Sequence, residues 1–102
     1  MSDRKIALVT GGSRGLGRAI SVRLAQDHGL HILVNYSSNA AAADETVKLV
    51  EEGGGTAETI GFNVADREGA HAALSAWMEA NPDEQISVIV NNAGITKDGL
   101  FM

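Results

Sequence analysis

The sequence has little or none of several residue types, and each shortage excludes a class of protein. None of the 102 residues is cysteine, which excludes a disulfide framework and any metal site built on thiolates. Lysine and arginine number 8 against 13 acidic residues, a formal charge of -5, so we expect no nucleic-acid partner. The apolar run from Ile6 to Val9 is too short for a signal-peptide core or a membrane span. We therefore expect a soluble, cytoplasmic protein with no membrane partner.

Short aliphatic and β-branched segments alternate with longer segments of helical periodicity. We predict strands at Lys5–Thr10, His31–Tyr36, Thr56–Phe62 and Ile86–Asn91. The third is the weakest in apolar residues and suits a sheet edge. The apolar stripes expected to face the sheet are Leu16, Ile20 and Leu24, then Ala43, Val47 and Val50, then Ala70, Ala73, Leu74 and Trp77. The alternation predicts βαβ units on a parallel sheet within one α/β domain, or part of one.

Residues that commonly cap helices stand at the expected ends of these helices. Asn39 and Asp66 are predicted N-caps, and Gly29 and Gly53 are predicted C-caps. His28 and His31 are therefore placed at a helix end and a strand start, where we do not expect them to share a metal ion. The sequence predicts no metal site.

A glycine-rich turn follows the first predicted strand and consists of Thr10, Gly11, Gly12, Ser13, Arg14, Gly15, Leu16 and Gly17. Small residues let the backbone turn sharply and approach a pyrophosphate, and the N-terminus of the next helix attracts the anion. The pattern is T-G-x-x-x-G-x-G, because Ser13 replaces the second glycine of G-x-G-x-x-G. Arg18 and Ala19 stand where a triphosphate loop requires lysine and serine or threonine, so we set aside ATP or GTP hydrolysis. The alternative is a turn that only permits close packing.

The end of the second predicted strand indicates which dinucleotide is preferred. An acidic residue usually grips the ribose hydroxyls of NAD about 20 positions beyond the turn. This strand instead ends in Asn35-Tyr36-Ser37-Ser38, with no carboxylate to repel a 2′-phosphate. Arg14 supplies a matching positive charge and Ser37 a hydrogen-bond donor. The sequence favours NADPH (NADP) over NAD; the alternative is that Arg14 is a solvated loop arginine and Ser37 part of a polar turn.

The segment Asn91-Asn92-Ala93-Gly94 follows the fourth predicted strand. Together with the T-G-x-x-x-G-x-G turn, it resembles the short-chain dehydrogenase/reductase family, and the match spans nearly the whole chain. The finer detail of residues 10–17, 63–64 and 91–98 is similar to the 3-oxoacyl-acyl-carrier-protein reductase subgroup, which reduces a β-keto thioester with NADPH in fatty acid biosynthesis. The resemblance implies a three-layer, doubly wound Rossmann-type sheet. Residues 1–102 would be the N-terminal part of a single NAD(P)-binding domain, with four strands in the order 3-2-1-4 and three helices.

The resemblance also implies a cofactor site. Residues expected to contact the pyrophosphate and the adenosine phosphate are Thr10, Gly11, Gly12, Ser13, Arg14, Gly15, Leu16 and Gly17. Ser37 would lie beside the 2′-phosphate, and Asn63 and Val64 would flank the adenine. Many family members have aspartate in place of Asn63, but an asparagine carbonyl can also accept from the adenine amino group. Asn92, Ala93 and Gly94 would line the ribose of the nicotinamide half and tie the fourth strand to its neighbour.

No residue of the chain can be assigned a catalytic role by the same resemblance. The family uses a serine, a tyrosine and a lysine downstream of N-N-A-G, and the only tyrosine here is Tyr36, outside any Tyr-x-x-x-Lys. We expect the chain alone to be inactive and its exposed fourth strand, Val88-Ile89-Val90, to favour association. The full-length protein would be a homo-oligomer, a tetramer or dimer, acting on an acyl-carrier-protein-linked or small ketone substrate.

Three alternatives stay open at this point. The first is a non-catalytic NAD(P)-binding module, and the second is a short-chain reductase of another ketone or of a sugar. The third is a methyltransferase, for which a closer G-x-G spacing and an acidic residue ending the second strand would be expected; neither is present.

Overall fold

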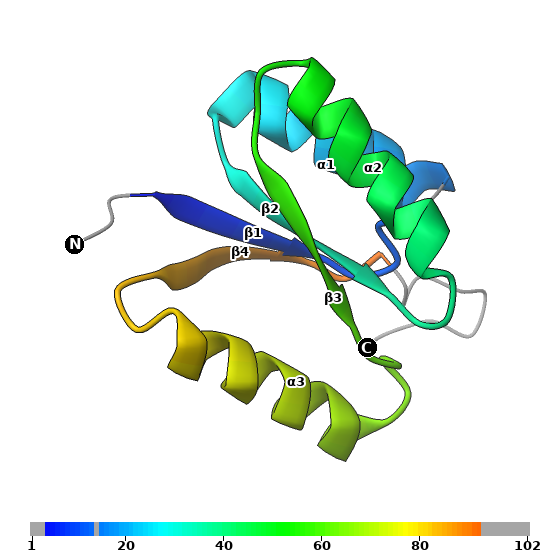
Figure 1. Ribbon diagram of the computed structural model, residues 1–102, viewed down its shortest axis with the longest axis vertical. Helices are drawn as coiled ribbons and strands as arrows, with labels where there is room; N and C mark the ends of the chain where they lie inside the picture. Colours follow the sequence, from blue (N-terminus) through cyan, green and yellow to red (C-terminus); the bar gives the residue numbers. More distant parts are fainter. Residues whose placement is uncertain (1–3, 14, 93–102) are drawn as a thin grey trace.

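Parallel strand pairing organises the chain, and the computed structural model describes residues 4–13 and 15–92 of it (Figure 1). The strands are β1 Lys5–Val9, β2 His31–Tyr36, β3 Ala57–Gly61 and β4 Gln85–Val90. The helices are α1 Gly15–His28, α2 Ala40–Glu52 and α3 Arg67–Ala80. The sheet order is β3-β2-β1-β4, which confirms the expected Rossmann-type topology and the edge position of the third strand. Each observed strand lies within one residue of its predicted bounds at either end.

The helices form two layers around the sheet, with α1 and α2 on one face and α3 on the other (Figure 1). Alternate residues of β1 serve the two faces because side chains point to opposite sides of a strand. Ala7 and Val9 join the core beneath α1 and α2, whereas Ile6 and Leu8 join the core beneath α3. All four are at most 2% exposed, so β1 is buried on both faces, as its continuous apolar run predicted.

The strand β4 changes face partway along its length. Its register against β1 shifts between Ile6 and Ala7, which pair with Ile86 and Val88 and leave Ser87 as the extra residue. Ile86 therefore packs with the α3 core, while Val88 packs with the α1 and α2 core. Ile89 lies on the α3 side, where it lines an open pocket with Leu8 and Leu74, and it is 66% exposed. The strand β4 thus leaves a large apolar side chain accessible to solvent.

The apolar stripe predicted for α1 is wrong in detail. Leu16 was expected to face the sheet but is 62% exposed, and the helix buries Gly17, Ser21 and Ala25 instead. Ile20 and Leu24 are half-buried at the margin of the core. The small residues let α1 approach the sheet closely, which a stripe of leucine and isoleucine would prevent. A search for large apolar residues alone therefore placed the contact face about one position away.

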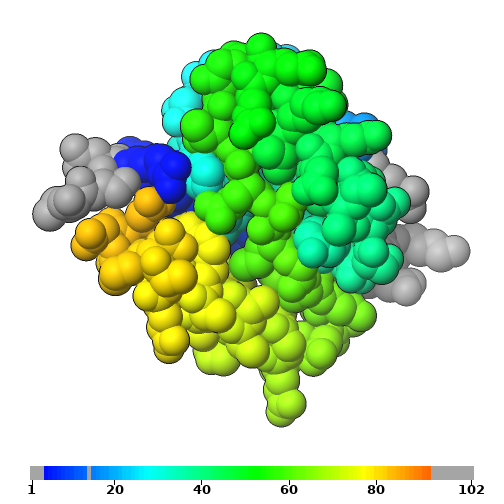
Figure 2. Space-filling model, in the orientation of Figure 1, coloured from blue at the N-terminus to red at the C-terminus, as the bar shows by residue number. Residues whose placement is uncertain are grey.

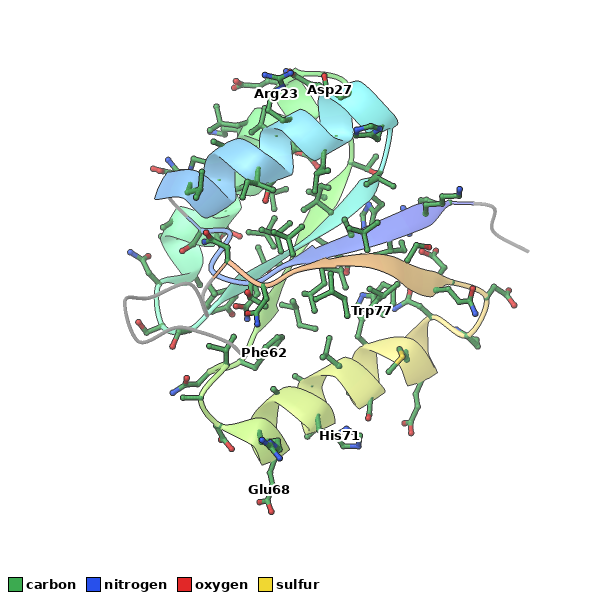
Figure 3. The ribbon with its side chains drawn as sticks, turned by 180° about the vertical axis from the view of Figure 1, so that it is seen from behind. Arg23, Asp27, Phe62, Glu68, His71 and Trp77 are labelled. Atoms are coloured by element: carbon green, nitrogen blue, oxygen red, sulfur yellow. The ribbon has the colours of Figure 1, made fainter. Side chains whose placement is uncertain are left out.

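The predicted stripes of the other two helices are confirmed. Ala43 and Val50 of α2 are buried. On α3, Trp77 is the buried residue, and it points from the helix toward the sheet while Glu68 and His71 point outward (Figure 3). Figure 2 shows α3 in yellow beside the green of α2 and β3, which together cover most of one side of the molecule.

The ends of α2 and α3 confirm the predicted capping residues. The side chains of Asn39 and Asp66 accept from the backbone amides of Ala42 and Gly69, as N-caps do. At the C-terminus of α2, Gly53 is the C-cap, as predicted, and its backbone amide donates to carbonyls of the last helical turn. The residue after it, Gly54, takes the left-handed conformation, with a φ of 92°.

Candidate cofactor site

The carboxyl ends of all four parallel strands meet at one edge of the sheet. The helix that follows β1, α1, covers one face of the sheet, and the helix that precedes β4, α3, covers the opposite face. The helical connections therefore lie on opposite faces on the two sides of the boundary between β1 and β4. Open α/β sheets bind ligands in the crevice at such a switch point. The glycine-rich turn follows β1 at this position, and Asn91 and Asn92 follow β4.

The turn has a backbone that requires glycine at two kinds of position. Gly11 and Gly15 have φ values of 65° and 62°, in the left-handed region that other residues rarely adopt. Gly17 is required for a different reason, since a Cβ there would collide with the carbonyl oxygen of Gly11 and lie 2.8 Å from its carbon. The helix N-terminus therefore packs directly on the turn, and no acidic residue occupies its first turn. This cradle fits a pyrophosphate.

Side chains from β2 and β4 hold the first residues of the turn. The side-chain oxygen of Asn35 accepts from the Gly11 amide at 3.0 Å, and its backbone oxygen accepts from Gly12 at 3.0 Å. Asn92 donates to the Gly11 carbonyl at 3.3 Å. The backbone amide of Thr10 donates to the Val90 carbonyl at 3.0 Å. The bond from Asn92 ties the segment after β4 to the turn that follows β1.

A second group of contacts comes from Thr46 of α2 and Arg18 of α1. The hydroxyl of Thr46 lies 2.9 Å from the Gly12 carbonyl oxygen and 3.0 Å from that of Ser13. The guanidinium of Arg18 reaches the Ser13 carbonyl at 2.7 Å and the Thr46 hydroxyl at 3.0 Å. The carbonyls of Gly11, Gly12 and Ser13 are thus all engaged by side chains.

The residues predicted for the adenosine half lie at the carboxyl ends of β2 and β3. Ser37 and Ser38 follow β2 and are exposed, and the carboxylate expected of an NAD-type strand end is absent from both positions. Asn63 follows β3, and its side-chain oxygen accepts from the Ala65 amide at 2.9 Å. A carbonyl oxygen has two lone pairs, so that of Asn63 can still accept from an adenine amino group. Val64 is 39% exposed beside it.

Three predicted site residues, Arg14, Ala93 and Gly94, lie outside the described residues. Their assignment stays a prediction. The described residues bring together the remaining predicted ones along the edge formed by the ends of β1 to β4.

Sequence reasoning missed the three side chains that hold the turn most directly, which are Asn35, Thr46 and Arg18. Two of them, Asn35 and Thr46, are polar residues within apolar segments, a pattern that could have identified them from the sequence. Asn35 is an amide that follows the aliphatic run Ile32-Leu33-Val34 of β2 and is only 2% exposed, and it also donates to the carbonyls of Ile60 and Phe62 at 3.3 and 3.1 Å. Thr46 is a fully buried hydroxyl three residues after Ala43 on the sheet-facing stripe of α2. A buried polar residue in an apolar stripe needs a partner, which here is the turn.

Other functional groups are not assembled in the described part of the chain. Within residues 4–13 and 15–92, no group of three or more histidine or acidic side chains is placed to hold a metal ion. None of the described helices is long and apolar enough to cross a membrane. His28 ends α1 and His31 begins β2, as the sequence predicted.

A parallel sheet with a glycine-rich turn at its switch point is the architecture of dinucleotide-binding domains. The chain belongs to the short-chain dehydrogenase family, whose model matches residues 5–102. This family comprises oxidoreductases that bind a nicotinamide cofactor.

Individual relatives agree on the family and differ in their reactions. An uncharacterized oxidoreductase, YgfF of Escherichia coli (strain K12), is 43% identical over 90 residues, which cover 88% of this chain and 35% of that protein. A 3-oxoacyl-[acyl-carrier-protein] reductase of Synechocystis is 38% identical over 98 residues, covering 96% of this chain and 38% of that protein. The solved structure of the promiscuous reductase LugOII, which catalyses keto-reduction at C1 during lugdunomycin biosynthesis, has a TM-score of 0.74 and 42% identity and covers 90% and 38% of the two chains. The chain therefore spans well under half the length of the relatives that it matches.

Proposed function

We propose that this chain supplies the cofactor-binding half of an NADPH-dependent carbonyl reductase that acts on a 3-oxoacyl thioester. The observation that supports the cofactor preference most directly is the end of β2, where Ser37 and Ser38 are exposed and no carboxylate occupies either position. A 2′-phosphate needs hydrogen-bond donors and positive charge there, and a carboxylate would repel it.

Among the cations of the turn region, the contacts favour Arg14 as the partner of that phosphate. Arg18 is already committed, because its guanidinium donates to Ser13, Ala42 and Thr46 and pairs with Glu45 at 3.3 Å. Arg14 lies within the turn in the sequence. Replacing Arg14 should therefore change cofactor preference, while replacing Arg18 should not.

Bound NADPH would supply the hydride that reduces a carbonyl to an alcohol, and the chain's own residues would bind and orient it. Amide groups of the turn and the N-terminus of α1 would hold the pyrophosphate. Asn63 and Val64 would flank the adenine, and Asn92, Ala93 and Gly94 the nicotinamide ribose. The general acid would come from a segment beyond residue 102 of the same protein.

The 3-oxoacyl thioester substrate rests on similarity to the Synechocystis reductase and on the sequence Asn91-Asn92-Ala93-Gly94-Ile95-Thr96-Lys97-Asp98. The competing possibility is a reductase of another ketone, which the similarity to LugOII favours. The two differ in the substrate and not in the cofactor site.

The test is a titration of NADPH and NADH, followed by fluorescence, against the product of the complete reading frame that encodes this chain. NADPH should bind more tightly, and Arg14→Ala should weaken NADPH by about tenfold or more while leaving NADH nearly unchanged, because the loss of one charge-assisted contact costs about 1.5–3 kcal/mol. Arg23→Ala, an exposed arginine of α1 paired with Asp27, is the matched control. Tighter binding of NADH would overturn the cofactor assignment. Turnover of acetoacetyl thioester against simple ketones then decides the substrate class.

A further inference from the structure

We propose that Thr46 and Arg18 form a brace that fixes the orientation of the peptide groups in the glycine-rich turn, and that they are positioning residues for the pyrophosphate. Neither would contact the cofactor. This inference rests on the proposed dinucleotide-binding function and adds to it the residues outside the turn that set its geometry.

The brace consists of a directed set of hydrogen bonds. The Nε of Arg18 donates to the Thr46 hydroxyl oxygen at 3.0 Å, and its Nη2 donates to the Ser13 carbonyl at 2.7 Å. A hydroxyl carries a single hydrogen, so Thr46 donates to one acceptor at a time. Since Arg18 already serves Ser13, the Thr46 hydrogen is free for the Gly12 carbonyl at 2.9 Å. Each of the two carbonyls thus has its own donor.

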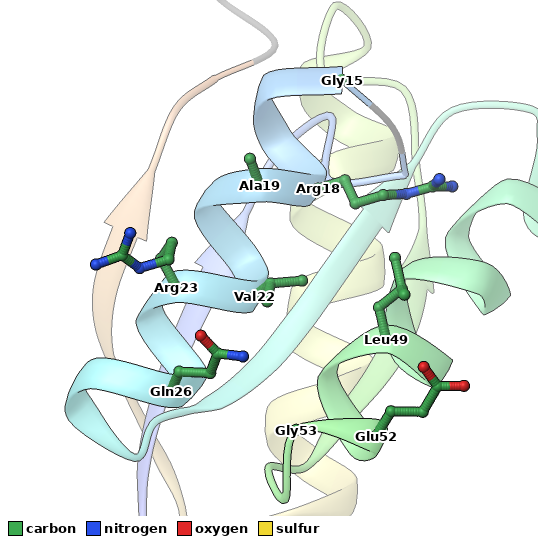
Figure 4. Close-up of a pocket in the computed structure, with 9 residues that line it drawn as sticks. All are labelled: Gly15, Arg18, Ala19, Val22, Arg23, Gln26, Leu49, Glu52 and Gly53. Atoms are coloured by element: carbon green, nitrogen blue, oxygen red, sulfur yellow. The ribbon is translucent and has the colours of Figure 1, made fainter.

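Both members of the brace are held in place by α2. Thr46 is fully buried on the face of α2 that meets the turn. Arg18 extends from α1 across to the N-terminal half of α2, as Figure 4 shows, where Nη2 also donates to the Ala42 carbonyl at 3.0 Å. Its side chain is 27% exposed and lines one end of a groove of about 600 Å³ between the two helices. The guanidinium is therefore a fixed structural cation with little freedom to move to a ligand.

The orientation of these carbonyls decides what the turn presents to an anion. In a trans peptide, the C=O and the following N–H point in opposite directions. With the Gly12 carbonyl drawn toward Thr46, the amide of Ser13 points away from α2. If the plane of the Gly12–Ser13 peptide rotated to the opposite orientation, its carbonyl oxygen would point at the pyrophosphate and repel it. Glycine at position 12 makes such a rotation easy, so the brace is needed to prevent it.

The experiment compares three ligands on the product of the complete reading frame. NADPH and NADH contain a pyrophosphate, whereas adenosine 2′-monophosphate contains only the adenosine half with its 2′-phosphate. Thr46→Val removes the hydroxyl at nearly constant shape and should weaken both dinucleotides by the same factor of about ten. Binding of adenosine 2′-monophosphate should stay within about twofold of the wild type. Thr46→Ser restores the hydroxyl and should restore dinucleotide binding, and Thr59→Val in β3 is the matched control.

The outcomes distinguish the loss of the brace from a general loss of folding, and the failure of the brace from the failure of the proposed function. Equal losses for all three ligands, or unchanged dinucleotide binding in Thr46→Val, would overturn the brace. If Thr46→Val does not fold, Arg18→Lys takes its place, because lysine keeps the charge and cannot donate in two directions. It should weaken both dinucleotides alike, while Arg23→Lys should not. A wild type that prefers NADH would refute the cofactor assignment and leave the brace to be judged on NADH, and a wild type that binds neither dinucleotide would refute both.

Discussion

The substitution Gly17→Ala tests the packing of α1 on the glycine-rich turn. In an open helix, the change would stabilise the protein by about 1 kcal/mol, because alanine is the better helix former. Here the added Cβ would collide with the Gly11 carbonyl oxygen and lie 2.9 Å from the side-chain nitrogen of Asn92. The Gly11 atoms belong to the backbone and cannot rotate away, so we place the steric cost at the upper end of the usual 1–3 kcal/mol for overpacking. The expected net loss of unfolding free energy is about 2 kcal/mol.

A matched control is available two residues earlier. A Cβ at Gly15 would meet nothing within 4 Å, so Gly15→Ala carries only the strain of a φ of 62°. That strain costs about 1–2 kcal/mol. The two variants are compared by urea denaturation and by NADPH titration of the complete protein. Gly17→Ala should lose NADPH affinity by about tenfold or more because the helix N-terminus has to move off the turn. If Gly17→Ala unfolded with the same free energy as the wild type and bound NADPH as tightly, the argument that contact requires this glycine would be refuted.

Four further predictions follow from contacts described above. Asn35→Leu removes the acceptor of the Gly11 amide and the side-chain donor to the Ile60 and Phe62 carbonyls, and should lower the unfolding free energy by about 3 kcal/mol in urea denaturation, together with NADPH affinity. Trp77→Ala removes the largest side chain beneath α3 and should cost about 3–5 kcal/mol by the same assay. Asp66→Ala removes the N-cap of α3 and should lower the thermal midpoint by an amount equivalent to about 1 kcal/mol. Ile89→Lys replaces the exposed apolar side chain of β4 with a charge and should reduce self-association of the 102-residue chain in sedimentation; a wild-type chain that sediments as a monomer would contradict this.

The strands, the helices and the turn were predictable because they depend on local patterns, whereas the strand order was expected only from the family resemblance. Continuous apolar strands alternating with amphipathic segments fixed the βαβ units, and T-G-x-x-x-G-x-G placed the turn between β1 and α1. The sheet-facing residues of α1 were not predictable from apolar periodicity. Close packing there depends on the small size of Gly17, Ser21 and Ala25, a property that a search for large apolar residues overlooks.

The residues that hold the turn were hidden for a different reason. Thr46 lies 34 positions from Gly12 in the sequence, and Arg18 lies on a helix surface where an arginine is usually solvated. Their pairing depends on how α1 and α2 pack against each other, which no local pattern specifies. Asn35 could have been singled out as a buried amide, but its partners could be identified only from the register of β2 with β1 and β3.

The connection between Thr10 and Val90 has a consequence for the order in which the molecule folds. The strand β1 lies between β2 and β4 in the described sheet, yet the β4 residue that pairs with Thr10 comes 80 residues later in the chain. Asn35 can reach Gly11 after 24 residues of chain, whereas Asn92 reaches it after 81. Closing the longer loop costs about 1 kcal/mol more in chain entropy. The half of the turn held by β2 should therefore form before the half held by β4. A dinucleotide bound at the proposed site would then stabilise chains in which β4 has docked over chains in which it has not, which couples cofactor binding to the docking of β4.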